Sequence, residues 1–178
     1  IRSKLIVAVK YVVPSSTIYV DSQARKHVFK SAAKRNASVA MSQPDLLRFE
    51  EQAWGSGFLH LAGVDEAGRG PLAGPVVAAA VSFSPEHIRA CAGTTYDALN
   101  DSKKLSAIRR EHYYEILQAD EAVEIGVGIV EAEEIDRINI LRATHHAMAE
   151  ALEVIQPQFA LIDGLPVDGL PCPSQSIV

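Results

Sequence analysis

Apolar and polar positions along this chain follow two different periods, one typical of strands and one typical of helices. Short apolar or alternating runs predict strands at residues 59–67, 76–83, 123–130 and 159–163. Residues 140–155 instead repeat apolar side chains every three or four positions, which predicts a helix. A second helix is predicted at residues 106–119, with Ser106 as its N-cap and Ile108, Ile116 and Leu117 for its buried side. Strands followed by helices and further strands indicate an α/β domain.

The helix at residues 140–155 has the clearest periodicity. Its buried face is predicted to consist of six side chains: Leu141, Thr144, Met148, Ala151, Leu152 and Ile155.

Two adjacent carboxylates, Asp65 and Glu66, stand at the end of the first apolar run. A carboxylate at the end of a buried strand is costly unless it is neutralised, and a bound divalent cation is one way to do so. Successive strand side chains point to opposite faces, so the two acids share one site only if the strand twists or ends there. Gly68 and Gly70 permit such an ending because they lack a Cβ.

The segment at residues 63–81, two apolar runs joined by this glycine-proline hinge, resembles the opening active-site motif of ribonuclease HII. Four more segments resemble the same family in the same order: residues 99–106, 134–144, 160–164 and 171–175. That family is the type 2 ribonuclease H, which cuts DNA strands at embedded ribonucleotides and RNA in RNA/DNA hybrids. The resemblance covers about residues 46 to 178 and implies a ribonuclease H-like mixed sheet flanked by helices, truncated at its carboxy-terminal side.

The resemblance implies that Asp65, Glu66 and Asp163 are the catalytic metal ligands. Two Mg²⁺ or Mn²⁺ ions would lie ~3.5–4 Å apart, one activating water and the other stabilising the leaving 3′ oxygen. Asp65 would be the central ligand. Carboxylate oxygens favour these cations over zinc, and no His/Cys cluster competes in the sequence. For an isolated Asp-Gly such as Asp163–Gly164, a solvated loop acid is the alternative.

Gly68, Arg69 and Gly70 correspond to the family's reader of sugar identity. A 2′-hydroxyl distinguishes RNA from DNA, and backbone groups exposed by glycine can recognise it. A tight turn between strands is the alternative reading of the same residues.

Three more residues, Ser102, Lys103 and Lys104, look like the family's phosphate-contacting loop. Asn100 stands where the family commonly has Asp. Asn139 and Arg142 are further candidates for contact with nucleic acid, with plain surface solvation as the alternative.

The resemblance therefore predicts an endoribonuclease that hydrolyses the RNA strand of RNA/DNA hybrids and nicks DNA 5′ to embedded ribonucleotides, leaving 5′-phosphate ends. The family uses a fourth acid, the aspartate of a Lys-Gly-Asp run that would follow Val178. We expect the 178-residue chain to be a fragment with little activity of its own. The alternative is a non-catalytic nucleic-acid-binding fragment of the same fold.

Charge is unevenly distributed along the chain, whose net charge is −5. Residues 1–44 hold eight Lys or Arg and one acid, whereas the remainder holds nine basic and 21 acidic residues. Attraction to a polyanion would therefore depend on local basic patches and bound cations. Two cysteines without a Cys-x-x-Cys pair favour a reducing compartment, and the apolar runs are too short for a membrane helix. We expect a cytoplasmic monomer with no membrane partner.

Composition divides the chain into three parts. Residues 1–40 form a basic extension, disordered or non-native, which we expect to add nothing to the fold. Residues 41–58 form a leader helix and residues 59–178 an incomplete catalytic domain. The extension resembles an organellar transit peptide or a basic nucleic-acid-binding arm. We favour a third interpretation, upstream sequence with Met41 as the true start, because residues 42–54 resemble the leader helix of bacterial members of the family.

Overall fold

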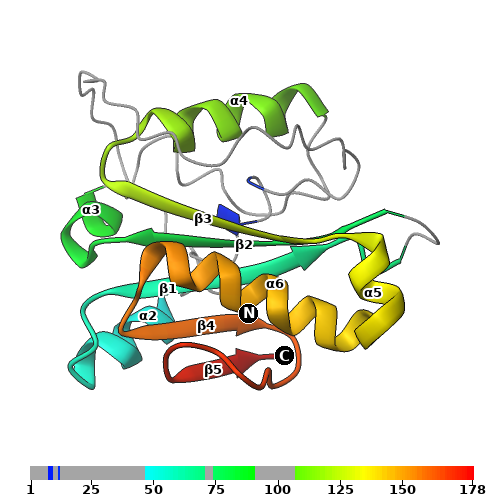
Figure 1. Ribbon diagram of the computed structural model, residues 1–178. Coiled ribbons are helices and arrows are strands. Elements are labelled where there is room, and N and C mark those ends of the chain that lie inside the picture. Colours follow the sequence, from blue (N-terminus) through cyan, green and yellow to red (C-terminus); the bar gives the residue numbers. More distant parts are fainter. Residues whose placement is uncertain (1–7, 10–11, 13–46, 71–73, 91–106) are drawn as a thin grey trace.

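A mixed five-stranded sheet with helices around it forms the frame of the molecule (Figure 1). The computed structural model describes residues 8–9, 12, 47–70, 74–90 and 107–178, without the side chains of residues 107–110. The elements are α2 (Arg48–Gly55), β1 (Leu61–Ala67), β2 (Val76–Phe83), α3 (Pro85–Ala90), α4 (Ala107–Ala119), β3 (Val123–Val130), α5 (Ala132–Ile138), α6 (Ile140–Ile155), β4 (Phe159–Asp163) and β5 (Ser174–Ile177).

The strand order is β3-β2-β1-β4-β5, which places β1 in the centre. β2 pairs antiparallel with both β1 and β3, whereas β4 runs parallel to β1 and to β5. The prediction of an α/β domain with a mixed sheet flanked by helices is thus confirmed.

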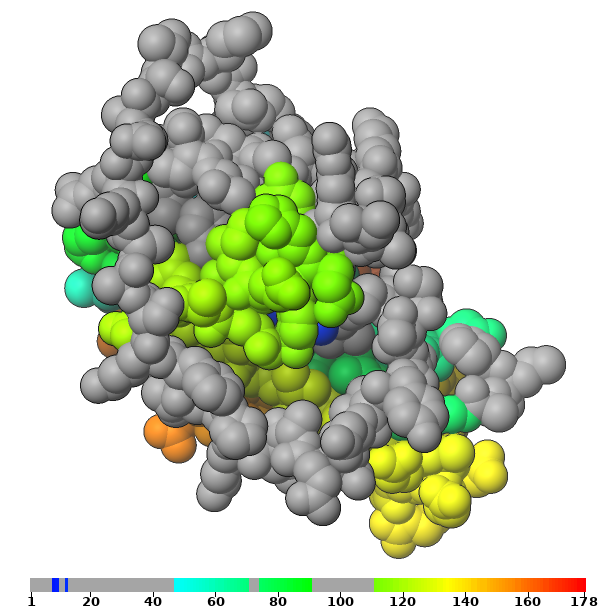
Figure 2. Space-filling view, turned by 90° about the horizontal axis from the view of Figure 1, so that it is seen from above, coloured from blue at the N-terminus to red at the C-terminus, as the bar shows by residue number. Residues whose placement is uncertain are grey.

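Side chains of the sheet alternate between two apolar clusters, one on each face. On one face, Leu61 and Leu161 pack with Trp54 of α2 and Leu117 of α4. On the other face, the even-numbered side chains of β1 and β4 pack against α6. Figure 1 shows α6 lying across the strands, and Figure 2, seen from above, shows α4 over the β3 side of the sheet. Because successive side chains point to opposite faces, the position of an acid along its strand decides which face it points to.

The buried face of α6 differs from the predicted one at its first turn. Leu141 is 52% exposed, whereas Ala143 and Ala147 are fully buried. A Cβ built on Gly128 would lie 2.0 Å from the carbonyl oxygen of Ala147, so the helix sits almost on the strand. Small side chains face the sheet here because larger ones would hold the helix away. The other five predicted positions are buried.

Three residues of the amino-terminal region are described, and they pack onto the sheet. Ala8 and Val9 are 0% and 1% exposed in the cluster with Leu61, and Val12 packs against it. The prediction that residues 1–40 lie apart from the fold stays a prediction, but these two buried side chains argue against it at their positions. Among the described helices, none combines the length and the apolarity needed to cross a membrane.

Candidate active site

Two of the predicted acids lie where the neighbouring parallel strands β1 and β4 stop pairing with each other. The register pairs Leu61 with Phe159 and continues to Val64 opposite Ile162. The residues that follow are Asp65 on β1 and Asp163 on β4, both partly exposed. Opposite residues of a parallel pair point to the same face, so the register places these carboxylates side by side. The chain therefore presents two hard oxygen donors at one end of the sheet.

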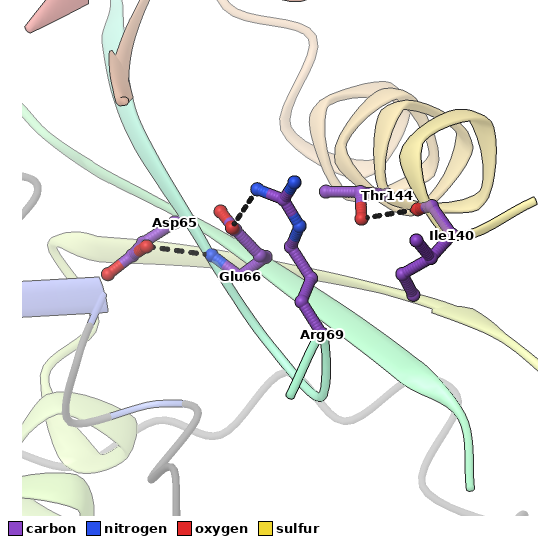
Figure 3. A network of polar contacts seen from close by, with 5 residues as sticks. All are labelled: Asp65, Glu66, Arg69, Ile140 and Thr144. Carbon is purple, nitrogen blue, oxygen red and sulfur yellow. Dashed lines mark hydrogen bonds and ion pairs between the residues drawn. The ribbon is translucent and has the colours of Figure 1, made fainter. Parts of the chain in front are cut away.

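Glu66 points to the other face, toward α6. Its Oε1 accepts a hydrogen bond from the Arg69 guanidinium at 3.0 Å, and the two side chains are 15% and 49% exposed. Asp65 bends the opposite way, and its Oδ1 accepts a hydrogen bond from the backbone N–H of Glu66 at 2.9 Å. Figure 3 shows the two carboxylates directed away from each other, with Arg69 reaching back to Glu66. The strand end brings Asp65 and Glu66 together in sequence but not on one face.

The turn after β1 exposes backbone next to these acids. Gly68 has φ of 98°, a left-handed conformation in which a side chain would be strained. A Cβ added at Gly70 would meet nothing within 4 Å, and both Arg69 and Gly70 are exposed. A ligand at this end of the sheet can approach the main chain of the turn closely.

Asn139 is the N-cap of α6. Its Oδ1 accepts hydrogen bonds from the backbone N–H groups of Leu141 at 3.0 Å and Arg142 at 3.2 Å, which satisfies two donors that the first turn leaves open. Its φ of 70° is unusual for a residue other than glycine. Asn139, a predicted contact with nucleic acid, therefore caps a helix in the folded chain. Arg142, the second predicted contact, is exposed.

A buried hydroxyl also lies on the α6 side of this region. Thr144 is 2% exposed, and its Oγ1 donates to the carbonyl of Ile140 one turn earlier at 2.8 Å. Figure 3 shows Thr144 on the helix face toward Glu66 and Arg69. The helical period predicted that Thr144 is buried, but not that it lies on the side of α6 that faces Glu66 and Arg69.

We compared the sequence of this chain with models of known protein families. A family model described as ribonuclease HII matches residues 62–176, a span that includes Asp65, Glu66 and Asp163. The chain belongs to the ribonuclease HII family.

Curated ribonuclease HII proteins of bacteria are similar over the same region. The protein of Syntrophus aciditrophicus is 54% identical over 119 residues, which cover 66% of this chain and 52% of that protein. The protein of Ruegeria pomeroyi is 49% identical over 144 residues, which cover 79% of this chain and 57% of that protein. The chain thus spans between half and three fifths of the length of these relatives.

Solved structures of archaeal ribonucleases H2 share the fold. The enzyme of Pyrococcus horikoshii is 26% identical with a TM-score of 0.53, over 67% of this chain and 61% of that chain. The ribonuclease HII of Archaeoglobus fulgidus, solved in complex with PCNA, is 27% identical with a TM-score of 0.51, over 66% and 63% of the two chains.

Divalent cations fit part of this ribonuclease HII site as it stands. Asp65 and Asp163 supply carboxylate oxygens from adjacent strands, the donor type that Mg²⁺ and Mn²⁺ prefer. Within the described part of the chain, however, no three His, Cys, Asp or Glu side chains are grouped so that they could hold a metal ion. Glu66 points to the opposite face of β1, where it pairs with Arg69.

The remaining predicted contacts of this ribonuclease HII chain, Ser102, Lys103 and Lys104, lie outside the described residues. One ion pair near the start of α6 is well defined: Arg137 donates two hydrogen bonds to Glu134, at 2.8 and 2.9 Å, and lowers the pKa of that carboxyl. Close to β5, burial raises the pKa of the Cys172 thiol, which disfavours the reactive thiolate.

Proposed function

We propose that this chain forms the active-site part of an endoribonuclease that hydrolyses the RNA strand of RNA/DNA hybrids. We propose further that it nicks DNA on the 5′ side of an embedded ribonucleotide. The observation that carries the proposal is the parallel register that sets Asp65 beside Asp163, next to the exposed turn at residues 68–70. Membership of the ribonuclease HII family supports the choice of reaction.

Each group has a separate part in this proposal. Asp65, Glu66 and Asp163 would hold two divalent cations. Bound Mg²⁺ or Mn²⁺ supplies positive charge, which stabilises the negative charge that develops on the phosphodiester and on the leaving 3′ oxygen. The backbone of Gly68 and Gly70, in the turn that follows the acids of β1, would bind the 2′-hydroxyl at the scissile position.

The proposed reaction is hydrolysis of one phosphodiester bond. Water attacks phosphorus, the bond to the 3′ oxygen breaks, and the products carry a 3′-hydroxyl and a 5′-phosphate. Nucleic acid would be held by Arg69 and by Ser102, Lys103 and Lys104, whose charges and hydroxyl suit phosphate. We propose a cytoplasmic monomer; the sparse cysteines favour such a reducing compartment.

A nicking assay on duplex DNA with a single ribonucleotide tests the proposal, run on this chain joined to the carboxy-terminal region of the Syntrophus aciditrophicus relative. Asp65→Asn should lower the rate by at least roughly 100-fold, because the central anionic ligand is lost while the shape of the side chain is kept. Asp168→Asn is the matched control: Asp168 is an exposed acid in the loop after β4, and its replacement should leave the rate unchanged. An all-deoxy duplex should stay intact. Cleavage that survives Asp65→Asn, or that ignores the ribonucleotide, would contradict the proposal.

The alternative function is binding without cleavage, and one observation favours it for the chain by itself. The described residues group no three metal-ligating side chains. We therefore propose that the 178-residue chain binds the duplex but nicks it slowly. The same chain joined to the carboxy-terminal region of the Syntrophus aciditrophicus relative should nick faster. Equal rates for the two proteins would show that the acids of this chain suffice.

A further inference from the structure

We propose that a cavity at the end of the sheet where β1 and β4 begin binds a lysine side chain of a partner protein. The cavity has a volume of about 530 Å³, which lies within the range of small-ligand sites. Figure 1 shows α3 and the start of β3 at this end of the sheet, and α5 at the other end. The proposed reaction uses no residue of this cavity, so the proposal does not depend on that reaction.

Three carboxylates from three different elements line the cavity. Glu86 lies on α3, Glu121 lies in the turn before β3, and Glu124 lies on β3. Among the described residues that line the cavity, only His60 can carry a positive charge, and its Nε2 lies 3.1 Å from Oε2 of Glu124. The second oxygen of Glu124 is still available to a ligand. An excess of carboxylates over basic groups favours a positively charged ligand.

An ammonium group suits this arrangement better than a metal ion or a guanidinium group does. Within the described residues, no three metal-ligating side chains are close enough together to hold a metal ion. A lysine ammonium carries three N–H donors, which can each reach a different acceptor. The planar guanidinium of arginine instead matches the two oxygens of a single carboxylate. Acids that come from three elements therefore favour lysine.

A buried hydroxyl in the cavity points to a ligand independently of the acids. Ser82 is 2% exposed and lines the cavity. The sheet register sets it opposite Glu124, and opposite side chains of neighbouring strands share a face. No hydrogen bond joins its Oγ to another described residue. A buried hydroxyl is costly without a partner, and a bound ammonium group would donate to it.

Gln158 favours a peptide over a free amine. Its Oε1 accepts hydrogen bonds from the backbone N–H groups of Leu59 at 2.8 Å and His60 at 3.1 Å. The side-chain amide is thereby fixed, and its Nε2 can donate to a carbonyl oxygen, which a peptide has and an alkylamine lacks. Leu59 is 61% exposed in the wall of the same cavity. It would pack against the aliphatic part of a lysine side chain.

Titration of the 178-residue chain with Nα-acetyl-lysine methylamide, followed by heteronuclear NMR, tests the proposal. The backbone signals of Ser82 and Glu124 and the side-chain amide signal of Gln158 should shift and saturate. The dissociation constant should be on the order of 10 mM, because solvent screens the exposed carboxylates. The norleucine analogue, which lacks the ammonium group, should shift none of these signals. Shifts spread over the whole surface would overturn the site.

Three variants test which groups hold the ammonium. Ser82→Ala should weaken binding roughly threefold to tenfold, because one acceptor is lost, and Glu121→Gln should weaken it roughly twofold to fivefold. Glu133→Gln is the matched control, since it removes an exposed charge of the same kind on α5 and should leave the affinity unchanged. Thermal unfolding checks that all three variants are folded. Equal weakening by Glu121→Gln and Glu133→Gln would show attraction by net charge alone and would overturn the site.

Two further ligands test the identity of the occupant. Pentylamine, which has an ammonium group and an aliphatic chain but no carbonyl, should bind more weakly than the lysine compound. Nα-acetyl-arginine methylamide should also bind more weakly, because its guanidinium is planar. Pentylamine binding as tight as that of the lysine compound would make the cavity a site for free amines. That result, or tighter binding of the arginine compound, would overturn the assignment to a lysine side chain of a partner.

Discussion

Two glycines of β3 determine how closely α6 packs on the sheet. Cβ atoms built at Gly126 and Gly128 would lie 2.1 and 2.0 Å from the carbonyl oxygens of Ala151 and Ala147. These are backbone atoms of the helix, which cannot move without shifting the whole element. The close contact therefore depends on the absence of a side chain at both positions.

Gly128→Ala should lower the free energy of unfolding by about 2 to 3 kcal/mol, because α6 has to move off the sheet to admit the methyl group. Urea unfolding measures the change, and the midpoint should fall with little change in slope. Gly55→Ala is the control, since a Cβ there meets nothing within 4 Å and Gly55 ends a helix in which alanine is favourable. Equal stability of Gly128→Ala and the unchanged protein would show that the helix is packed less closely.

Side-chain orientation at the site is the part that sequence patterns did not predict. The carboxylates of Asp65, Glu66 and Asp163 were recognisable as a group by motif, and the alternation of strand side chains warned that neighbours diverge. Which of the two acids would lie beside Asp163 depended on the register of β1 against β4, and register is set by long-range pairing. The ion pair between Glu66 and Arg69 was not predicted either, because the sequence does not show which acid Arg69 pairs with.

At the scale of elements, four strands and the long helix α6 were predicted well, whereas two short helices were not. The bounds of β2, β3, β4 and α6 are those predicted from the pattern, and β1 begins two residues later than predicted. The helices α3 and α5, with six and seven residues, were missed because so few turns give no clear period. Leu141 was misassigned because apolarity alone does not show which stripe of a helix meets the sheet.

The cap of α6 provides an element-scale prediction. Asn139→Ala should lower the free energy of unfolding by about 1 to 2 kcal/mol, because two backbone donors lose their acceptor and alanine disfavours the positive φ. Asn139→Gly should cost only a few tenths of a kcal/mol, since glycine accepts that φ and is a tolerable cap. Thermal or urea unfolding separates the two variants.

Hybrid binding by the same two variants tests the other role predicted for Asn139. Both replacements remove the side-chain amide, so a direct contact with nucleic acid would weaken binding equally in both. If binding weakens only in Asn139→Ala, the less stable of the two variants, Asn139 acts through the helix cap alone.

At the scale of the whole molecule, one cluster joins buried side chains of the amino-terminal region to those of α2, α3, α4 and four strands. Val9→Asp should lower the free energy of unfolding by at least about 2 kcal/mol, because Val9 is 1% exposed and a buried carboxylate without a partner is costly. The control, Val154→Asp, places the same group on an exposed part of α6 and should change stability little. If Val9→Asp were harmless, residues 1–40 would add nothing to the fold, as their composition suggests.

The alternation of side chains along β1 also limits the direction from which a polymer can reach both of its acids. Asp65 belongs to the odd-numbered set and Glu66 to the even-numbered set, so the sheet itself stands between them. A strand of nucleic acid laid flat on either face would meet one carboxylate and have the other behind the sheet. Contact with both requires an end-on approach, with the polymer crossing the rim where β1 and β4 terminate. Neighbouring strands lie about 4.8 Å apart, so a polymer crossing that rim would meet Asp65 and Asp163 within one strand spacing.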